Sequence, residues 1–271
     1  MSEPLLKVSD LWVKYRGVDS AAVSRVSFSL DAGATLGVIG ESGAGKSTLA
    51  LALMGLLDKE KAEVSGTTLF KERPLLALSE KEFSRIRGRE AAMIFQDPIG
   101  SLDSTLRIDV QVAEAVRIHS DPGRAAAMRQ ARLHLARVGI GPAILKAAPY
   151  PHQLSGGLCQ RVMIAIALAA GPELLIADEP TSSLDTILQS QIISLIKNEQ
   201  RRFGLSLLFV SHDLALVSKI ADQIMVMYRG EQVELGSTDA VINAPEHSYT
   251  RELLDAWHAD RPKEGAQVGP A

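Results

Sequence analysis

Eight consecutive residues have the types and spacing of a phosphate-binding loop. Gly40 to Ser47 reads G-E-S-G-A-G-K-S and is followed by Thr48. Glycines allow the backbone to curl until successive amides point inward at phosphate oxygens. We expect Lys46 to reach the β- and γ-phosphates of a nucleotide and Ser47 to hold Mg²⁺. An ordinary glycine-rich turn with a surface lysine would not account for the whole pattern, so nucleotide binding is predicted for Gly40, Glu41, Ser42, Gly43, Ala44, Gly45, Lys46, Ser47 and Thr48.

Two adjacent carboxylates follow an apolar run farther along the chain. Leu174 to Ala177 are all apolar, and Asp178 and Glu179 come directly after them. We expect Asp178 to orient Mg²⁺, usually through a coordinated water, and Glu179 to polarise the attacking water as general base. Alone, the pair would fit a solvated acidic strand end equally well. Together with the phosphate loop it predicts a nucleotide-hydrolysing centre.

Strands and helices must bring these two stretches together. Ala34 to Ile39 is predicted to be a short buried strand and Ser47 to Leu56 a helix, so the glycines lie at a strand-to-helix turn. The apolar run before Asp178 is predicted to be a central parallel strand beside that turn, because strands buried on both faces are continuously apolar. Ser206 to Ser211 and Gln223 to Tyr228 continue the sheet.

A second stretch offers phosphate-binding chemistry far from the first loop. Leu154-Ser155-Gly156-Gly157 precedes a helix predicted from about Leu158 to Ala170, with Gln160 and Arg161 in its first turn. A Ser-Gly-Gly run opening a helix exposes amides and a hydroxyl that can bind an anion. The simpler alternative, a helix N-cap made by Ser155, does not account for Gln160 and Arg161 or for the downstream carboxylates. One nucleotide has one γ-phosphate, so two such sites indicate that this chain alone is not a complete active site.

In their order, these motifs resemble those of the ATP-binding subunit of an ABC transporter over nearly the whole chain. The resemblance implies ATP and Mg²⁺ as cofactors and a head-to-tail dimer. In that dimer each ATP lies between one subunit's phosphate loop and the partner's signature, here Ser155, Gly156, Gly157 and Gln160. It also implies that Ser182-Ser183-Leu184-Asp185 crosses between subunits and brings Asp185 to the nucleotide.

The same resemblance gives roles to three residues whose types alone would mean little. Tyr15 is placed where an aromatic ring stacks on adenine, although it would also suit a half-buried strand. Gln96 is expected to touch Mg²⁺ or the water and to link the site to membrane subunits. His212 is expected to contact the γ-phosphate, although a lone histidine at a strand end is more often structural. The expected catalytic residues are Glu179, His212 and Gln96, and the expected metal-binding residues are Ser47, Gln96 and Asp178.

The fold implied is an α/β P-loop NTPase core of ABC type, with an antiparallel β subdomain and an inserted α-helical subdomain. Val110 to His119 and Arg124 to Gly139 have helical spacing, with turns at Asp121-Pro122-Gly123 and Gly139-Ile140-Gly141-Pro142. We expect four segments: residues 1–95 as the first part of the core, 96–157 as the helical subdomain through the signature, 158–256 as the second part of the core, and 257–271 as a polar, frayed tail.

Four passages resemble more closely the ATPases of dipeptide, oligopeptide and nickel importers: residues 93–102, 150–157, 225–230 and 247–254. The chain departs from that pattern at Asp97, where Glu is frequent, at Ser248, where proline is usual, and at Cys159, where a polar or basic residue is common. A cysteine-rich tail is absent, so no iron-sulfur cluster is expected. We expect the Cys159 thiol to lie beside the surface between subunits, where a bulky thiol reagent should lower hydrolysis.

Composition fits a partner protein of the cell interior. The 271 residues suffice for one nucleotide-binding core with a subdomain, and the net charge of −3 gives no general reason to expect nucleic acid. A single cysteine excludes an intramolecular disulfide and suits a reducing compartment. No signal segment is recognised, and the best apolar run, Val162 to Ala170, is too short to span a bilayer. We therefore expect a peripheral location on the cytoplasmic face of the inner membrane, held there by other chains.

The expected function is ATP hydrolysis that powers import of di- or oligopeptides or a related small solute. Nickel or metal-chelate import is the alternative within the subfamily, and a non-transport ABC ATPase the more distant one. The expected partners are a second ATPase subunit, in a heteromer or a homodimer, two permeases and, indirectly, a solute-binding protein. An SMC-like or repair ATPase would need a long coiled coil between residues 46 and 154, and a soluble kinase would not account for the signature or His212. An exporter half would carry a fused membrane segment.

Overall fold

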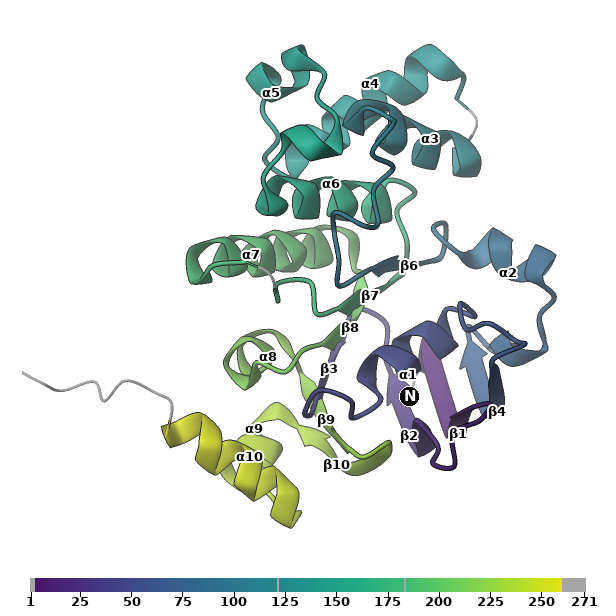
Figure 1. The fold of residues 1–271 in the computed structure, drawn as a ribbon, viewed down its shortest axis with the longest axis vertical. Helices are drawn as coiled ribbons and strands as arrows, with labels where there is room; N and C mark the ends of the chain where they lie inside the picture. The colour runs from purple at the N-terminus through teal and green to yellow at the C-terminus, as the bar shows by residue number, and fades with distance from the viewer. Residues whose placement is uncertain (1–2, 121, 183, 260–271) are drawn as a thin grey trace, which may run out of the picture.

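A single curved sheet runs through the molecule, and helices lie on both of its faces (Figure 1). The computed structural model describes residues 3–120, 122–182 and 184–259. Within them the sheet has the strand order β5-β4-β1-β2-β10-β9-β3-β8-β7-β6. The strands are β1 (Leu6–Tyr15), β2 (Val23–Leu30), β3 (Thr35–Ile39), β4 (Ala62–Phe70), β5 (Arg73–Pro74), β6 (Ala91–Ile94), β7 (Leu174–Asp178), β8 (Ser206–Val210), β9 (Gln223–Tyr228) and β10 (Glu231–Ser237).

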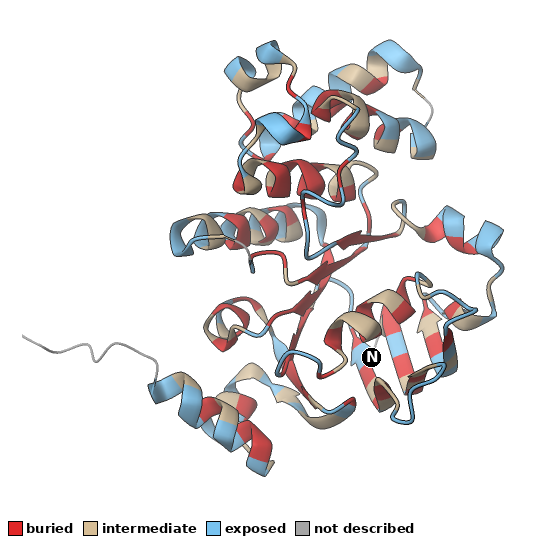
Figure 2. Cartoon of the chain, in the orientation of Figure 1, coloured by how far each residue is buried: buried red, intermediate tan, exposed pale blue. Residues whose placement is uncertain are grey.

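The half of the sheet that leads to the predicted site is parallel. β3 pairs with β8 and β9, and β7 pairs with β6 and β8, all in parallel register. Every residue of β3, β6, β7 and β8 is buried (Figure 2), as expected for strands covered on both faces. Their carboxyl ends therefore lie along one edge, where the loops that follow can meet.

The other half is antiparallel and forms a separate subdomain wall. β1 pairs with β2 and β4, and β4 pairs with β5. Burial alternates along β2 and β4, since one face of these strands packs inward and the other meets solvent. Helix α1 (Lys46–Leu53) shares a hydrophobic core with this wall and with the near face of the parallel strands. The helix that follows the phosphate loop is thus held from two sides.

The helices on the opposite face form a second core. α3 (Ile108–Ser120), α4 (Arg124–Arg137), α5 (Pro142–Ala147) and α6 (Gly156–Leu168) gather at one end of the molecule (Figure 1). Their buried residues are continuous with those under α7 (Thr186–Phe203) and α8 (Leu214–Ile220). The remaining helices are α2 (Glu80–Ile86), α9 (Thr238–Asn243), α10 (Ser248–Ala259) and the short 3₁₀ turns Leu75–Ala77 and Pro151–Gln153.

The predicted α/β class and the predicted strands are confirmed, and the helix ends differ by small amounts. α1 begins at Lys46 and ends at Leu53, because Gly55 takes a left-handed conformation with φ of 58° and ends the helix before Leu56. α6 starts at Gly156, two residues earlier than predicted, because Ser155 accepts a hydrogen bond from the Leu158 amide and caps it. α3 and α4 lie where helical spacing predicted them; Asp121, which was expected in a turn between them, lies outside the described residues.

The expected tail is partly wrong. α10 continues to Ala259, so residues 257–259 are helical, because the apolar stripe of this helix packs on the second core with Leu254 buried and Trp257 partly buried. The rest of the expected tail, from residue 260, lies outside the described residues. The expected boundary at 157/158 falls inside α6.

Candidate functional site

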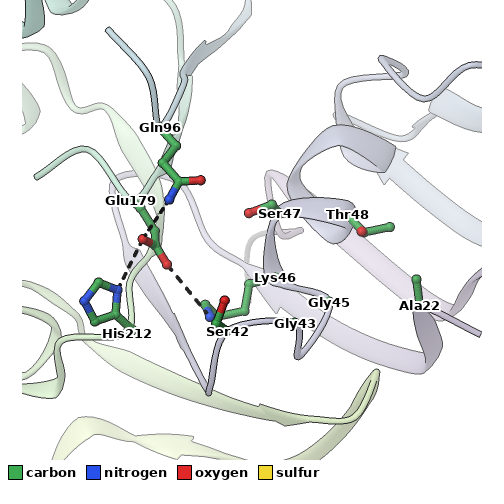
Figure 3. Close-up of a pocket in the computed structure, with 10 residues that line it drawn as sticks. All are labelled: Ala22, Ser42, Gly43, Gly45, Lys46, Ser47, Thr48, Gln96, Glu179 and His212. Atoms are coloured by element: carbon green, nitrogen blue, oxygen red, sulfur yellow. Dashed lines mark hydrogen bonds and ion pairs between the residues drawn. The ribbon is translucent and has the colours of Figure 1, made fainter. Parts of the chain in front are cut away.

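Residues from four strand ends converge on one pocket. β3 leads into the phosphate loop, β7 ends in Asp178 and is followed by Glu179, His212 follows β8, and Gln96 follows β6. They border a pocket with a volume of about 480 Å³ (Figure 3). Its lining is Ala22, Ser42, Gly43, Gly45, Lys46, Ser47, Thr48, Gln96, Glu179 and His212.

The phosphate loop adopts a curl that requires glycine. Gly45 has φ of 97°, and a Cβ there would lie 2.1 Å from the carbonyl oxygen of Ala22. At Gly40 a Cβ would lie 2.2 Å from the carbonyl oxygen of Met227. The loop is therefore pressed between the start of β2 on one side and the end of β9 on the other, and a side chain at either glycine would force them apart.

Lys46 lies inside this curl with 5% of its side chain exposed. Its Nζ donates to the carbonyl oxygens of Gly40 at 2.8 Å and Glu41 at 2.9 Å. Burial lowers the pKa of Lys46, and the carboxylates of Glu179 and Asp178 act in the opposite direction. The ammonium is held over the pocket by neutral acceptors, from which it can turn to a phosphate oxygen.

Ser47, which lines the pocket, and Asp178, which is buried behind it, place two oxygen atoms side by side. The Ser47 hydroxyl donates to Oδ1 of Asp178 at 3.0 Å. Burial raises the pKa of Asp178, while the Ser47 hydrogen bond lowers it. A hydroxyl, a carboxylate and the nearby amide of Gln96 are hard oxygen donors of the kind that Mg²⁺ prefers. Among the described residues, no group of three His, Cys, Asp or Glu is placed to hold a metal ion.

The Glu179 carboxylate contacts three polar side chains that line the pocket (Figure 3). Its Oε1 lies 4.0 Å from Nζ of Lys46, and its Oε2 lies 3.2 Å from Nδ1 of His212. Gln96 Nε2 donates to the same Oε2 at 3.2 Å. The side chain of Glu179 is only 13% exposed, so these partners hold a largely desolvated carboxylate at the pocket mouth.

The backbone of Glu179 is strained. Its φ is 45°, a left-handed conformation that costs a non-glycine residue roughly 1–2 kcal/mol. The Glu179 amide donates to the carbonyl of Val210 at 2.9 Å, which fixes the turn directly after β7. Strain of this kind persists where the surrounding structure imposes it.

Tyr15 lies near the loop, outside the lining of the pocket. Its hydroxyl is 3.4 Å from Oγ1 of Thr48, and the residue lines a smaller pocket with Lys14, Arg16 and Val18. Ala22, which was not expected at the site, lines the pocket, and its carbonyl oxygen lies against Gly45. No pattern in the sequence distinguishes that alanine from others, because its role comes from its backbone.

The signature residues lie at the start of α6, in the helical part of the molecule (Figure 1). Ser155 is exposed, and a Cβ built on Gly156 meets no described atom within 4 Å. Gly157 is buried and faces Leu188 of α7. None of these residues is among the lining of the phosphate-loop pocket in the part of the chain that the structure describes. The Ser155-Gly156 surface is thus open to another molecule.

Two expectations about α6 are wrong. Cys159 is fully buried in the second core, where its Sγ lies 3.5 Å from the Pro151 carbonyl oxygen, so the thiol is not on an exposed surface between subunits. Burial also raises the pKa of this thiol. Gln160 is only 1% exposed, and its Nε2 has no hydrogen-bond partner among the described residues, so it cannot reach a nucleotide across an interface in this conformation. Both side chains are buried, while Ser155 at the N-cap of the helix is exposed.

Asp185 caps α7 by accepting hydrogen bonds from the amides of Ile187 and Leu188, both at 3.0 Å. The preceding Ser182 is exposed and donates to the Glu179 carbonyl at 3.2 Å, and Ser183 lies outside the described residues. The loop that resembles a crossing segment therefore begins directly on the backbone of Glu179. A conformational change of this loop can therefore shift the backbone that carries the Glu179 carboxylate.

The comparisons with known proteins agree with this arrangement. A family model described as "ABC transporter" matches residues 23–182. The chain is 46% identical over 257 residues to the dipeptide transport ATP-binding protein DppD of Lactococcus lactis subsp. cremoris (strain MG1363), a match that covers 94% of this chain and 74% of that protein. It is 44% identical over 255 residues to the glutathione import ATP-binding protein GsiA of Escherichia coli (strain K12), covering 92% of this chain and 40% of that protein. The chain thus spans less than half the length of GsiA.

Solved structures share the fold. CbiO1 from Clostridium perfringens, described as part of the ABC transporter complex cbiONQ, superposes with a TM-score of 0.77 at 26% identity, covering 95% of this chain and 99% of that one. The dimeric ATP-binding cassette MJ0796 bound to ADP and phosphate superposes with a TM-score of 0.77 at 24% identity, covering 86% and 98%. No helix in the described residues has the length and apolar character needed to cross a bilayer.

Proposed function

Because this chain belongs to the ABC transporter family of ATP-binding domains, we propose that it hydrolyses ATP as the nucleotide-binding subunit of a solute importer. The observation that carries the proposal is the Glu179 carboxylate, held between Lys46, Gln96 and His212 at the mouth of the phosphate loop. A carboxylate in that place can accept a proton from a water aimed at a γ-phosphate.

The proposed roles come from the family resemblance and are compatible with the positions of these side chains around the pocket. The loop amides from Ser42 to Thr48 and the Lys46 ammonium bind the phosphates, and Tyr15 holds the base. Glu179 takes the proton of the attacking water, Gln96 orients that water, and His212 steadies the γ-phosphate. Catalysis is then mainly positioning and electrostatic stabilisation, as in other phosphoryl transfers.

Mg²⁺ fits the oxygen atoms of Ser47 and Asp178, with Gln96 as a further donor. When bound, the ion neutralises developing charge on the phosphate oxygens.

The chain acts in an assembly. The open surface at Ser155 and Gly156 is proposed to close over the ATP of a second ATPase subunit, together with Gly157 and the Asp185 loop. A heteromer is preferred over a homodimer. Two permeases anchor the pair at the cytoplasmic face of the inner membrane and receive the motion through Gln96 and the helical segment 96–157, between core segments 1–95 and 158–256; a solute-binding protein delivers cargo.

The proposed cargo is a di- or oligopeptide. Relatives named for dipeptide transport and for glutathione import, glutathione being a short peptide, support this class. Nickel or a metal chelate is the alternative cargo within the subfamily that the sequence resembles.

Transport by the assembled complex in liposomes tests the function. We expect ATP-dependent uptake of a labelled dipeptide in the presence of the solute-binding protein of the transporter. Uptake should be lost in Lys46→Ala, which removes the buried ammonium. Uptake of Ni²⁺ and no peptide would transfer the assignment to the alternative cargo. ATP consumption with a phosphorylated small molecule as product would overturn the importer proposal.

A further inference from the structure

The outer side of the phosphate loop is supported by the C-terminal part of the chain. The pocket is lined from Ser42 onward, and Glu41 is not part of that lining among the described residues. The Gly230 amide, in the turn between β9 and β10, donates to the Ala44 carbonyl at 3.1 Å. The carbonyl oxygen of Met227 lies so close to Gly40 that a Cβ there would be 2.2 Å from it. The hairpin formed by β9 and β10 therefore backs the loop on the side away from the phosphates.

Tyr249 of α10 completes this support. Its hydroxyl oxygen accepts a hydrogen bond from the Glu41 amide at 3.2 Å. Its ring stacks on Tyr228 with a centroid distance of 4.1 Å and an interplanar angle of 30°. Tyr249 is 7% exposed, and burial raises the pKa of its hydroxyl, which stays neutral at physiological pH. One amide of the loop thus points outward and is satisfied by a residue 208 positions later in the chain.

The start of α10 is fixed to the sheet, so Tyr249 is not free to follow the loop. The Glu234 carboxylate on β10 accepts hydrogen bonds from the amides of Glu246 at 2.9 Å and His247 at 3.1 Å. Nδ1 of His247 in turn accepts from the Tyr249 amide at 3.2 Å. These contacts give the tyrosine hydroxyl a defined position relative to β10.

We propose that Tyr249 is a positioning residue for ATP: through the Glu41 amide it holds the phosphate loop in the curl that receives the phosphates. Glu41 donates to Tyr249 through its amide and accepts a hydrogen bond from Lys46 through its carbonyl, as Gly40 also does. Fixing Glu41 therefore also fixes an acceptor that holds the lysine before nucleotide arrives. By linkage, nucleotide that binds the ordered loop must stabilise α10 in return. The proposal rests on the function above and adds a determinant of nucleotide affinity that does not touch the nucleotide.

Tyr249→Phe removes the hydroxyl and keeps the stacked ring. Tyr228→Phe is the matched control, because the Tyr228 hydroxyl makes no hydrogen bond to another described residue while its ring makes the same stack. Loss of one hydrogen bond should raise the KM for ATP about three- to tenfold in Tyr249→Phe, with kcat unchanged. Tyr228→Phe should keep the KM of the natural protein. The assembled transporter supplies the hydrolysis assay, and titration of the isolated subunit with a fluorescent ATP analogue supplies the affinity.

Hydrogen exchange of α10 provides the second readout. In the natural protein and in Tyr228→Phe, ADP should slow amide exchange in Ser248–Ala259, and in Tyr249→Phe this protection should disappear. An unchanged KM in Tyr249→Phe, equal changes in both variants, or ADP protection of α10 that survives the loss of the hydroxyl would overturn the proposal. Failure of the function itself would look different, because the natural protein would then neither bind nor hydrolyse ATP.

Discussion

Replacing Glu179 with glutamine separates catalysis from binding. The amide is nearly isosteric, and its oxygen can still accept from one of Gln96 and His212, each 3.2 Å from Oε2 of the natural carboxylate. The proton acceptor is lost, and general-base catalysis typically contributes about 10²- to 10⁴-fold. This corresponds to roughly 3–5 kcal/mol in the barrier at about 1.4 kcal/mol per factor of ten.

The effect on the fold should be much smaller. At 4.0 Å the attraction between Glu179 and Lys46 is reduced, but the substitution also removes the desolvation cost of a carboxylate that is 13% exposed. We expect unfolding free energy to change by about 1 kcal/mol. Nucleotide affinity of the isolated subunit should remain within about threefold of the natural value, since ATP contacts the loop and Lys46.

The assay is steady-state phosphate release by the assembled transporter, with Glu60→Gln as the matched substitution on an exposed surface. Glu60→Gln should hydrolyse at the natural rate. A Glu179→Gln transporter that hydrolyses ATP as fast as the natural one would refute the role of this carboxylate as base. A loss of hydrolysis accompanied by an equal loss of ATP binding would refute the separation of roles.

Three further outcomes follow from the structure. Because Cys159 is buried and burial raises the pKa of its thiol, a bulky maleimide should modify it only on the timescale of unfolding, and rapid labelling of native protein would contradict its placement. Glu90, directly before β6, pairs with Lys71 and Arg73 of the β4–β5 hairpin. Glu90→Gln should therefore lower the unfolding free energy by about 1 kcal/mol at low salt, as measured by urea titration. The Arg73 hydrogen bond lowers the pKa of Glu90 in the folded protein, so the ionised carboxylate stabilises the fold at pH values above the pKa of Glu90 in the unfolded chain. The difference in unfolding free energy between the natural protein and Glu90→Gln should therefore fade as pH falls below about 4. A difference that does not depend on pH would exclude the ion pair as its cause. Gly45→Ala should abolish nucleotide binding because the added methyl meets the Ala22 carbonyl, and retained affinity in a titration would show that the loop can relax.

The parallel strands and the phosphate loop were predictable because their signals are local. β3 and β7 are short, mostly apolar runs, and the loop between β3 and α1 has a fixed pattern of glycines before Lys46. Strand ends in a parallel sheet then place Asp178 beside Ser47 without further information. The convergence of Gln96 and His212 on Glu179 needed family resemblance, since neither residue has a local signal of its own.

What the sequence could not provide depends on rotation and on contacts between distant segments. The spacing of α6 did not reveal that Cys159 and Gln160 face the core, because a short helix with apolar residues on most sides has no clear exposed face. Asp185 was expected to contact the nucleotide, but in the structure its carboxylate caps α7. Which of these contacts it makes depends on the conformation of the loop. Tyr249 meets Glu41 across 208 residues, and nothing in either segment predicts the other.

The central claim is that this chain provides half of each ATP site and that the Ser155-Gly156 surface completes the site of a partner. Gly156→Asp tests it, because a Cβ at Gly156 meets no described atom within 4 Å, while a carboxylate there would face the phosphates of the partner's ATP. The measurement is hydrolysis by the assembled transporter beside ATP affinity of the isolated subunit. The account predicts hydrolysis reduced more than about tenfold by like-charge repulsion, with unchanged affinity in the isolated subunit. Natural hydrolysis rates in the assembled Gly156→Asp transporter would contradict it.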